Sequence, residues 1–266
     1  MMKLAITGYP LLYTRSPALH RGFLRNARIS GRYDVLPFNP KKGRKAFFSF
    51  LDGLASDGYR GLNVTVPLKE WAYDYAVKRG RGTVPGLHGR CAKLVRAANT
   101  LVFKTGVALA ANTDAHGLWS DVEVKFKKKI FGNFDVVVIG TGGSARGVIA
   151  GFLSGQGLAK RAASIDVWGR DQKKVRRLRS LFKAKDPSAE RACLVLWCLP
   201  PVSTREAKAI WKKTLGKHEK HKYFLYDLNY GERALSTEAL VPRSRRSTGL
   251  GMLKNQARAS FELWKS

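Results

Sequence analysis

Cysteine is scarce in this 266-residue sequence, which bears on metal binding and on the cellular compartment. The three cysteines, Cys91, Cys193 and Cys198, are odd in number and show no Cys-x-x-Cys spacing. Structural zinc sites and disulfide frameworks need more cysteines at regular spacings. We therefore expect no bound metal and a reducing compartment, the cytoplasm.

Long apolar runs are missing as well. No stretch approaches the roughly 18 apolar residues that a membrane-spanning helix requires. The N-terminal residues MMKLAITG have too short an apolar region for a signal peptide and are typical of a first strand. Because 44% of the residues are hydrophobic, the chain can still bury a substantial core. These features predict a soluble intracellular protein without a membrane partner.

Acidic residues are also scarce. The sequence has 19 aspartates and glutamates but 49 lysines and arginines, which gives a formal net charge of +30. Such an excess occurs in proteins that bind nucleic acids or anionic small ligands, and in unusually basic proteomes. The basic residues are spread along the chain, with denser runs at 124–129, 171–185 and 212–222. A dedicated nucleic-acid module would more often show a concentrated basic arm or a known motif. We therefore expect no specific nucleic-acid partner, and the charge alone identifies no ligand.

A regular alternation of strand and helix patterns is what the sequence does contain. Strands are predicted at 3–8, 32–38, 61–66, 99–103, 107–113, 134–140, 164–169, 194–199 and 224–229, and helices at 16–29, 42–58, 69–78, 114–126, 144–155 and 251–264. This alternation predicts an α/β fold with helices covering the sheets. Residues 104–106 (KTG) predict a hairpin, and a second unit is predicted to start near residue 114.

Residues 61–72 (GLNVTVPLKEWA) place a lysine at an unusual point. Pro67 suits the first position of a helix, where its missing N–H group costs nothing. Lys69 would then lie in the first turn, beside the positive end of the helix dipole, where a cation is disfavoured. Most lysines are solvated surface residues, so this position alone does not identify a catalytic group.

A glycine-rich turn follows the apolar strand pattern at 134–140. Gly140, Gly142 and Ala145 satisfy the Gly-x-Gly-x-x-Gly/Ala pattern of dinucleotide-binding sites, in the required order of strand, turn and helix. In such a turn the backbone approaches a pyrophosphate, and the N–H groups of the helix N-terminus bind it. The pattern predicts a nucleotide site, with a merely tight strand–helix turn as the alternative.

Several further motifs follow one another along the chain. Residues 8–10 (GYP) and 14–20 (TRSPALH) resemble the patterns G-x-P and S-x-S-P-x-x-H, and residues 63–69 (NVTVPLK) resemble N-V-T-x-P-x-K. Residues 98–100 (ANT), 112–117 (NTDAHG) and 249–256 (GLGMLKNQ) resemble three more patterns, the last two being N-T-D-x-x-G and G-L-x-M-L-x-x-Q. Motifs of this kind in this order are those of the shikimate dehydrogenases, a family that the sequence resembles from Gly8 to Trp264.

The resemblance implies two α/β domains: a substrate-binding catalytic domain at 1–113 and a Rossmann-type NADP-binding domain at 114–238. It also implies that the terminal helix, at 239–266, returns to the first domain. The implied activity is the reversible NADPH-dependent reduction of 3-dehydroshikimate to shikimate, a step of aromatic amino-acid biosynthesis. The implied partners are these small molecules, and the expected assembly is a monomer or a homodimer.

The resemblance also assigns roles to residues around a substrate. Lys69 would give a proton to the carbonyl oxygen as hydride arrives from the nicotinamide, and Asp114 would hold the ammonium and bond the adjacent substrate hydroxyl. The implied substrate-binding residues are Thr14, Ser16, Thr65, Asn99, Tyr230 and Gln256. The three hydroxyl residues suit a carboxylate and the two amides suit ring hydroxyls, whereas the tyrosine could instead be a packing residue.

The implied cofactor-binding residues are Gly140, Thr141, Gly142, Gly143, Ser144, Gly169, Arg170, Asp171, Lys173, Lys174, Leu228 and Gly249. Arg170 can stack on adenine and pair with a 2′-phosphate, which two lysines of the following helix could also reach. Val175, Leu178 and Leu181 would form the buried face of that helix. Asp171 could bind a free 2′-hydroxyl, but its place at the helix start favours an N-cap role. We therefore expect NADP, with NAD as the alternative cofactor.

Departures from the family pattern are concentrated near the expected cofactor. GRD at 169–171 stands where N-R-T is common, and WCLP at 197–200 replaces N-A-T-P. At the expected substrate site, Thr14 replaces the usual serine, and Tyr230 lacks the proline that usually follows it.

These departures leave other functions open. Quinate or an aminated shikimate analogue could replace shikimate, and NAD could replace NADP. A non-catalytic relative that binds nucleic acid or senses a metabolite is the alternative from another class. Lys69, Asp114 and Gln256 argue against it, because a protein that only binds has no need of a proton donor.

Overall fold

The computed structural model describes residues 1–12, 14–80, 82–104, 107–155, 157–182, 188, 190–216 and 222–266. The chain forms two compact units, one made of residues 1–117 and 254–266 and the other of residues 118–253. Each unit contains a five-stranded sheet with helices on its faces, which confirms the α/β prediction. Among the described residues, no helix is both long enough and apolar enough to span a membrane.

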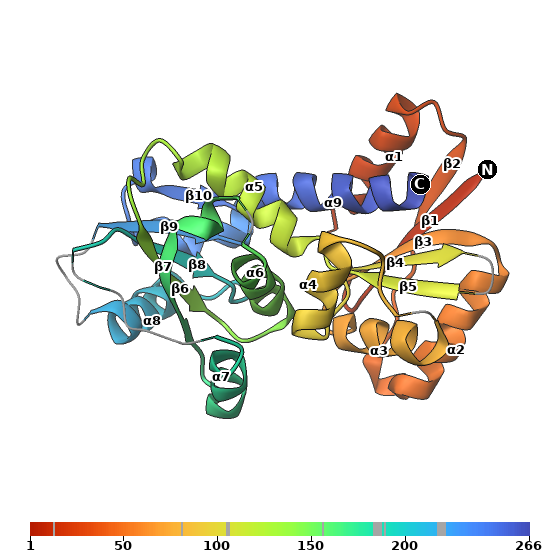
Figure 1. Cartoon of the computed structure of the whole chain (residues 1–266), viewed down its shortest axis with the longest axis horizontal. Coiled ribbons are helices and arrows are strands. Elements are labelled where there is room, and N and C mark those ends of the chain that lie inside the picture. Colours follow the sequence, from red (N-terminus) through yellow and green to blue (C-terminus); the bar gives the residue numbers. More distant parts are fainter. Residues whose placement is uncertain are drawn as a thin grey trace. The chain divides into compact units, whose positions relative to one another are not determined.

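The first unit contains β1 (Met2–Thr7), α1 (Ser16–Asn26), β2 (Gly31–Val35), η1 (Pro40–Lys42), α2 (Gly43–Ser56), β3 (Tyr59–Val64), α3 (Lys69–Arg79), α4 (Leu87–Val95), β4 (Thr100–Lys104) and β5 (Val107–Ala111). Its sheet has the strand order β2-β1-β3-β4-β5 (Figure 1). Strand β1 runs parallel to β2 and β3, whereas β4 is antiparallel to β3 and β5.

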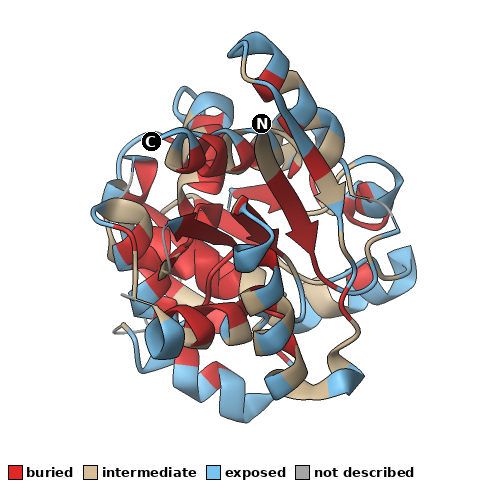
Figure 2. Cartoon of the chain, turned by 90° about the vertical axis from the view of Figure 1, so that its right-hand side faces the viewer, coloured by how far each residue is buried: buried red, intermediate tan, exposed pale blue. Residues whose placement is uncertain are grey.

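Both faces of this sheet are covered by helices, and successive strand residues point to opposite faces. On one face Ala5 and Leu62 pack with α2 and α3, and α2 contributes Phe47, Leu51 and Leu54 at helical spacing. On the other face the neighbouring strand residues pack with α1 and the end of the chain, which contributes Phe261 and Trp264. Figure 2 shows the strands largely buried and the outer sides of the helices exposed.

The second unit contains β6 (Phe134–Ile139), α6 (Gly143–Leu153), η2 (Gly157–Arg161), β7 (Ala162–Trp168), α7 (Gln172–Arg179), β8 (Cys193–Trp197), α8 (Thr204–Leu215), β9 (Tyr223–Asp227), η3 (Gly231–Thr237), η4 (Arg243–Arg245) and β10 (Arg246–Thr248). Its sheet has the order β10-β9-β8-β6-β7, and all four strand pairs are parallel. Two helices have residues in both units: α5 (Asp114–Phe126) and α9 (Leu250–Lys265).

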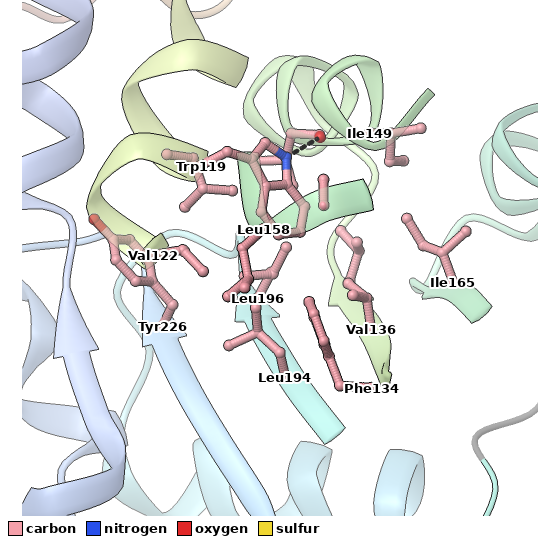
Figure 3. Packing of buried hydrophobic residues seen from close by; sticks show 14 of the residues in the cluster. Trp119, Val122, Phe134, Val136, Ile149, Leu158, Ile165, Leu194, Leu196 and Tyr226 are labelled. Carbon is pink, nitrogen blue, oxygen red and sulfur yellow. Dashed lines mark hydrogen bonds between the residues drawn. The ribbon is translucent and has the colours of Figure 1, made fainter. Parts of the chain in front are cut away.

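The apolar run at 134–139 is explained by burial of both faces of the parallel sheet. Val136 and Val138 point into a core shared with α5 and α6, whereas Val137 and Ile139 point into one shared with α8. Figure 3 shows the first of these cores, in which the Trp119 indole N–H donates to the Val148 carbonyl at 3.3 Å.

Several sequence predictions need correction. Pro67 is not the first residue of a helix; it lies in a turn, and α3 begins two residues later at Lys69. Leu181 is exposed and lies beyond the end of α7, so only Val175 and Leu178 form its buried face. The pairing of β4 with β5 confirms the hairpin strands, while Thr105 and Gly106 of its turn lie outside the described residues. The sequence patterns did not predict α4, α8 or β10.

Candidate active site

Lys69 and Asp114 form a buried ion pair in the first unit. Lys69 is the first residue of α3, Asp114 is the first residue of α5, and Nζ lies 2.6 Å from Oδ2. Each side chain is less than one-tenth exposed. The carboxylate lies at a helix N-terminus, where negative charge is stabilised, and it offsets the unfavourable position of the lysine. A buried ammonium in such a pair can give a proton to an oxygen atom or take one back.

Asn99 fixes the second oxygen of that carboxylate. Its amide nitrogen donates to Asp114 Oδ1 at 2.8 Å, and its amide oxygen accepts from the Thr113 backbone N–H at 2.9 Å. Because a carboxylate only accepts and an N–H only donates, these two contacts determine which way the amide is turned. The Asn112 side chain holds the backbone at the start of α5, because its amide oxygen accepts from the Asp114 N–H at 3.2 Å.

Gln256 belongs to the same cluster, although it lies far from the other members in the sequence. It is on α9, in the part of that helix that belongs to the first unit. Its amide oxygen accepts from Asn99 Nδ2 at 3.2 Å and from Thr113 Oγ1 at 3.4 Å. The structure therefore brings Lys69, Asp114, Asn99 and Gln256 together, as the family resemblance implies.

The three predicted hydroxyl residues lie elsewhere in the first unit. Ser16 is the buried first residue of α1, and its backbone N–H donates to Thr14 Oγ1 at 3.3 Å. Thr65 follows β3, and its methyl group lies so close to Gly8 that a Cβ at that glycine would overlap it. In the described part of the chain, no side-chain hydrogen bond links Thr14, Ser16 or Thr65 to the Lys69–Asp114 pair.

Two histidines lie next to the cluster, His88 on α4 and His116 on α5. Their ring centroids are 5.5 Å apart. Burial lowers the pKa of His116, and burial together with the neighbouring His116 lowers the pKa of His88 to about 4. Both imidazoles are therefore neutral near pH 7 and add no cation beside Asp114.

The glycine turn of the second unit connects β6 to α6. Gly140 has a φ of +126°, and a Cβ there would lie 3.1 Å from the Cys198 backbone. The turn is held between neighbouring strands, since the Gly140 N–H donates to the Trp168 carbonyl and the Cys198 N–H donates to the Ile139 carbonyl, both at 2.8 Å. At Gly169, a Cβ would lie 2.6 Å from Thr141 Cγ2. Glycine is thus required at both points of close approach.

This turn fits the pyrophosphate of a dinucleotide. Gly142 is the N-cap of α6 and Gly143 and Ser144 are its first residues, with no side-chain cap and no acidic residue in the first turn. A Cβ at Gly142 would meet no atom within 4 Å. Backbone N–H groups at such an end bind anions.

The residues expected around the adenosine lie at the start of α7. The Asp171 carboxylate caps this helix by accepting from the Lys173 and Lys174 backbone N–H groups at 3.0 and 3.1 Å, which confirms the N-cap prediction. These hydrogen bonds lower the pKa of Asp171. Arg170 and both lysine side chains are exposed.

Tyr230, Leu228 and Gly249 lie near the end of β9. Tyr230 is half-buried. The chain before it is held by Asp227, whose carboxylate accepts from the Asn229 N–H at 2.8 Å and from Thr237 at 2.7 Å, and whose pKa is raised by burial. A Cβ at Gly249 would overlap the Leu228 backbone, so this contact needs glycine. All three residues belong to the second unit.

Sequence reasoning missed the polar residues behind the amide cluster. Thr100, Thr113 and Ser260 are fully buried and hydrogen-bonded to one another or to Asn99. Thr100 and Thr113 lie inside two of the quoted motifs, and Ser260 lies one helical turn after Gln256. The spacing of four residues on a predicted helix was the signal that could have found Ser260.

Residues 6–81 match the family model described as the shikimate dehydrogenase substrate binding domain. The chain is 31% identical to the shikimate dehydrogenase (NADP(+)) of Rhodopseudomonas palustris strain BisB5, over 97% of this chain and 87% of that protein. It is 32% identical to the protein of the same name from Herminiimonas arsenicoxydans, over 98% and 91% of the two chains.

A solved structure with the same fold is the shikimate 5-dehydrogenase of Thermus thermophilus in complex with NADP(H) and shikimate. It superposes with a TM-score of 0.73 at 22% identity, covering 99% of this chain and 93% of that chain. Together with the whole-length similarity to the curated relatives, this likeness leads to one conclusion: the chain belongs to the shikimate dehydrogenase family.

Proposed function

We propose that the protein catalyses the reversible NADPH-dependent reduction of 3-dehydroshikimate to shikimate. The observation that carries this proposal is the buried Lys69–Asp114 ion pair at 2.6 Å, with the amides of Asn99 and Gln256 hydrogen-bonded around it. The names of the relatives support it, since they are shikimate dehydrogenases that use NADP(+). One relative of the same fold also binds NADP(H) and shikimate.

Lys69 acts as the acid–base group in this mechanism. When bound, the nicotinamide cofactor supplies or accepts the hydride. During reduction, Lys69 Nζ gives a proton to the carbonyl oxygen of the substrate, which becomes the hydroxyl oxygen. During oxidation the neutral amine takes the proton from that hydroxyl. Asp114 holds the ammonium in place and accepts a hydrogen bond from the adjacent substrate hydroxyl.

The remaining polar residues bind and orient the ring. Asn99 and Gln256 each carry an amide that can donate to and accept from ring hydroxyls, while Thr14, Ser16 and Thr65 carry hydroxyls suited to the carboxylate. Tyr230 adds a phenol hydroxyl for the same carboxylate. Holding the reacting atoms in one geometry accounts for a large part of the catalytic effect in such sites.

The cofactor residues form the second part of the proposal. The backbone of residues 140–144 holds the pyrophosphate at the N-terminus of α6, with Gly169, Leu228 and Gly249 lining the path of the dinucleotide. Arg170, Lys173 and Lys174 bind the 2′-phosphate, and Asp171 stays engaged as a helix cap. Residues 1–113 and the terminal helix thus supply most of the substrate-binding groups, Asp114 and Tyr230 add two more, and residues 114–238 bind NADP.

The assembly and compartment complete the proposal. We expect a monomer or homodimer in the cytoplasm whose ligands are small anions, with no specific nucleic-acid partner. Sedimentation of the purified chain, alone and with excess duplex DNA at physiological salt, tests the assembly and the absence of a nucleic-acid complex.

The activity is tested by an assay of the purified chain with shikimate and with quinate, each with NADP⁺ and with NAD⁺. We expect reduced nicotinamide to accumulate fastest with shikimate and NADP⁺. Faster turnover of quinate would make quinate the substrate in place of shikimate. No turnover in any of the four mixtures would overturn the proposed function.

A further inference from the structure

Ser260 lies on the face of α9 that packs against the first unit. Gln256, Ser260 and Trp264 follow one another at intervals of four residues, so they occupy one side of the helix. Ser260 is fully buried, with 0% of its surface exposed, and no ligand can reach its hydroxyl directly. Gln256, one turn earlier, is only half-buried.

The Ser260 hydroxyl connects the helix to strands β3 and β4 and to the chain before α5. Its Oγ lies 2.7 Å from Thr100 Oγ1 and 3.2 Å from Thr113 Oγ1. It also accepts from Asn63 Nδ2 at 3.2 Å and donates to the Gln256 carbonyl at 3.0 Å. A hydroxyl has one proton and two lone pairs, so not all four contacts can be full hydrogen bonds at once, and its single proton serves either Thr100 Oγ1 or the Gln256 carbonyl.

The partners of Ser260 are the same groups that hold the amide cluster. Thr100 Oγ1 donates to Asn99 Oδ1 at 3.0 Å, and Thr113 Oγ1 donates to the Gln256 amide oxygen at 3.4 Å. Any shift of α9 at Ser260 therefore moves the Gln256 side chain relative to Asn99. Among the described residues, no hydrogen bond runs from Ser260 to Lys69 or Asp114.

We propose that Ser260 is a positioning residue, which sets the place of Gln256 in the substrate site by fixing one turn of α9 against Thr100 and Thr113. The inference rests on the proposed function, because it assumes that Gln256 binds a hydroxyl of the substrate. Ser260 itself touches neither substrate nor cofactor. Its loss changes how well shikimate binds and leaves the proton transfer at Lys69 in place.

The test is a double-mutant cycle with Ser260→Ala and Gln256→Ala, with shikimate and NADP⁺ as substrates and calorimetry to measure shikimate binding directly. We expect Ser260→Ala to raise the KM for shikimate roughly five- to tenfold with kcat within about twofold of wild type, and with the KM for NADP⁺ unchanged. In the Gln256→Ala background, the same substitution should change the KM for shikimate less than about twofold.

Two further variants separate positioning from stability. Ser260→Cys keeps the shape of the side chain with a somewhat larger atom and weakens its hydrogen bonds, and it should reproduce the rise in KM if the alanine variant fails to fold. Phe261→Leu is the matched control, because Phe261 is buried on the same helix and packs against Phe23 and the His20 ring. It should lower the melting temperature without raising the KM for shikimate.

Three results overturn the inference while leaving the proposed function intact. The first is a KM for shikimate within twofold of wild type in both serine variants. The second is an equal rise in KM with and without Gln256. The third is a rise in Phe261→Leu as large as in Ser260→Ala. A wild-type chain that neither binds nor oxidises shikimate overturns the proposed function, and the inference with it.

Discussion

Both carboxylate oxygens of Asp114 accept hydrogen bonds in the amide cluster. Oδ2 accepts from Lys69 at 2.6 Å and Oδ1 accepts from Asn99 at 2.8 Å. In Asp114→Asn the new NH₂ group faces a donor whichever way the amide is turned, either the ammonium or the Asn99 amide. We expect kcat with shikimate and NADP⁺ to fall at least about a hundredfold.

The control for this prediction is Asp52→Asn. Asp52 is also paired with a cation, Arg79 at 3.0 Å, but the pair lies at the surface of the same unit. The substitution removes the same charge and should leave kcat unchanged. An Asp114→Asn variant with a rate close to that of the control would remove Asp114 from the mechanism.

His20 makes the stability of the fold depend on pH. It is fully buried and stacked on Tyr33, with the two ring centroids 4.4 Å apart. Burial lowers its pKa from 6.5 to about 3. The unfolded chain therefore binds a proton that the folded chain does not, from pH 6.5 downwards. The stabilisation is fully present above pH 6.5 and is lost as the pH falls towards 3.

The pH effect is measured from the midpoint of urea unfolding at about pH 7 and about pH 5. We expect the wild-type midpoint to be lower at the acid pH, and His20→Phe, which removes the ionisable group from an aromatic cluster, to show a smaller drop. The lowered pKa of His88 leaves part of the drop in place in this variant. An equal drop in wild type and variant would mean that His20 is not the group responsible.

The end of α9 is fitted to β3 through a single glycine. A Cβ at Gly61 would overlap the indole ring of Trp264, which is fully buried and donates to the Leu101 carbonyl at 2.9 Å. Gly61→Ala should therefore displace the helix end and lower the free energy of unfolding by about 1–3 kcal/mol, measured by urea unfolding.

Gly53→Ala is the matched substitution. Gly53 is exposed in α2, and a Cβ there would meet no atom within 4 Å. Alanine has the higher helix propensity, so this variant should be as stable as wild type or slightly more stable. If Gly61→Ala is equally stable, the close contact between the two elements does not hold the terminal helix.

Elements with a clear periodicity were predictable from the sequence, and those defined by tertiary contacts were not. The parallel strand at 134–139 was found because its residues are nearly all apolar, and α7 from its cap residue and from Val175, Leu178 and Leu181, the last of which is exposed. In contrast, α8 was not predicted, although its sequence contains a capping pattern. The Ser203 side chain accepts from the Glu206 backbone N–H. Strand β10 has only three residues and depends on its pairing with β9.

The site shows the same division. Motif residues such as Lys69, Asp114 and Asn99 could be named from the sequence because their order resembles a family. The buried hydroxyls of Thr100, Thr113 and Ser260 were not named, although two of them lie in the motifs and the third lies four residues after Gln256, because only the folded chain shows that they contact one another.

The whole chain has a formal net charge of +30, and both proposed ligands are anions. Around the predicted 2′-phosphate site, the exposed cations Arg170, Lys173 and Lys174 outnumber one carboxylate, and that carboxylate is engaged as a helix cap. We expect kcat/KM to be higher with NADP⁺ than with NAD⁺ by at least roughly tenfold, which is about 1.4 kcal/mol. Added salt should narrow the ratio, because it screens the 2′-phosphate.

Charge reversal at single positions shows which cations cause the preference for NADP⁺. Arg170→Glu should shrink the NADP⁺ to NAD⁺ ratio, whereas Arg177→Glu, with the same change of charge further along α7, should leave it nearly unchanged. Equal reductions in the two variants would attribute the preference to the net charge of the chain. A wild-type enzyme that uses NAD⁺ equally well would mean that Asp171 binds the ribose despite its helix-cap contacts.

In the proposed mechanism Lys69 moves the proton during the oxidation of shikimate. The decisive measurement is the turnover of Lys69→Ala with shikimate and NADP⁺, alongside shikimate binding by calorimetry. We expect kcat to fall by several orders of magnitude while shikimate still binds, because proton transfer and positioning are lost together and the other binding groups remain. If Lys69→Ala keeps even about a tenth of the wild-type turnover, Lys69 is not the acid–base group, since general acid–base catalysis contributes much more than that.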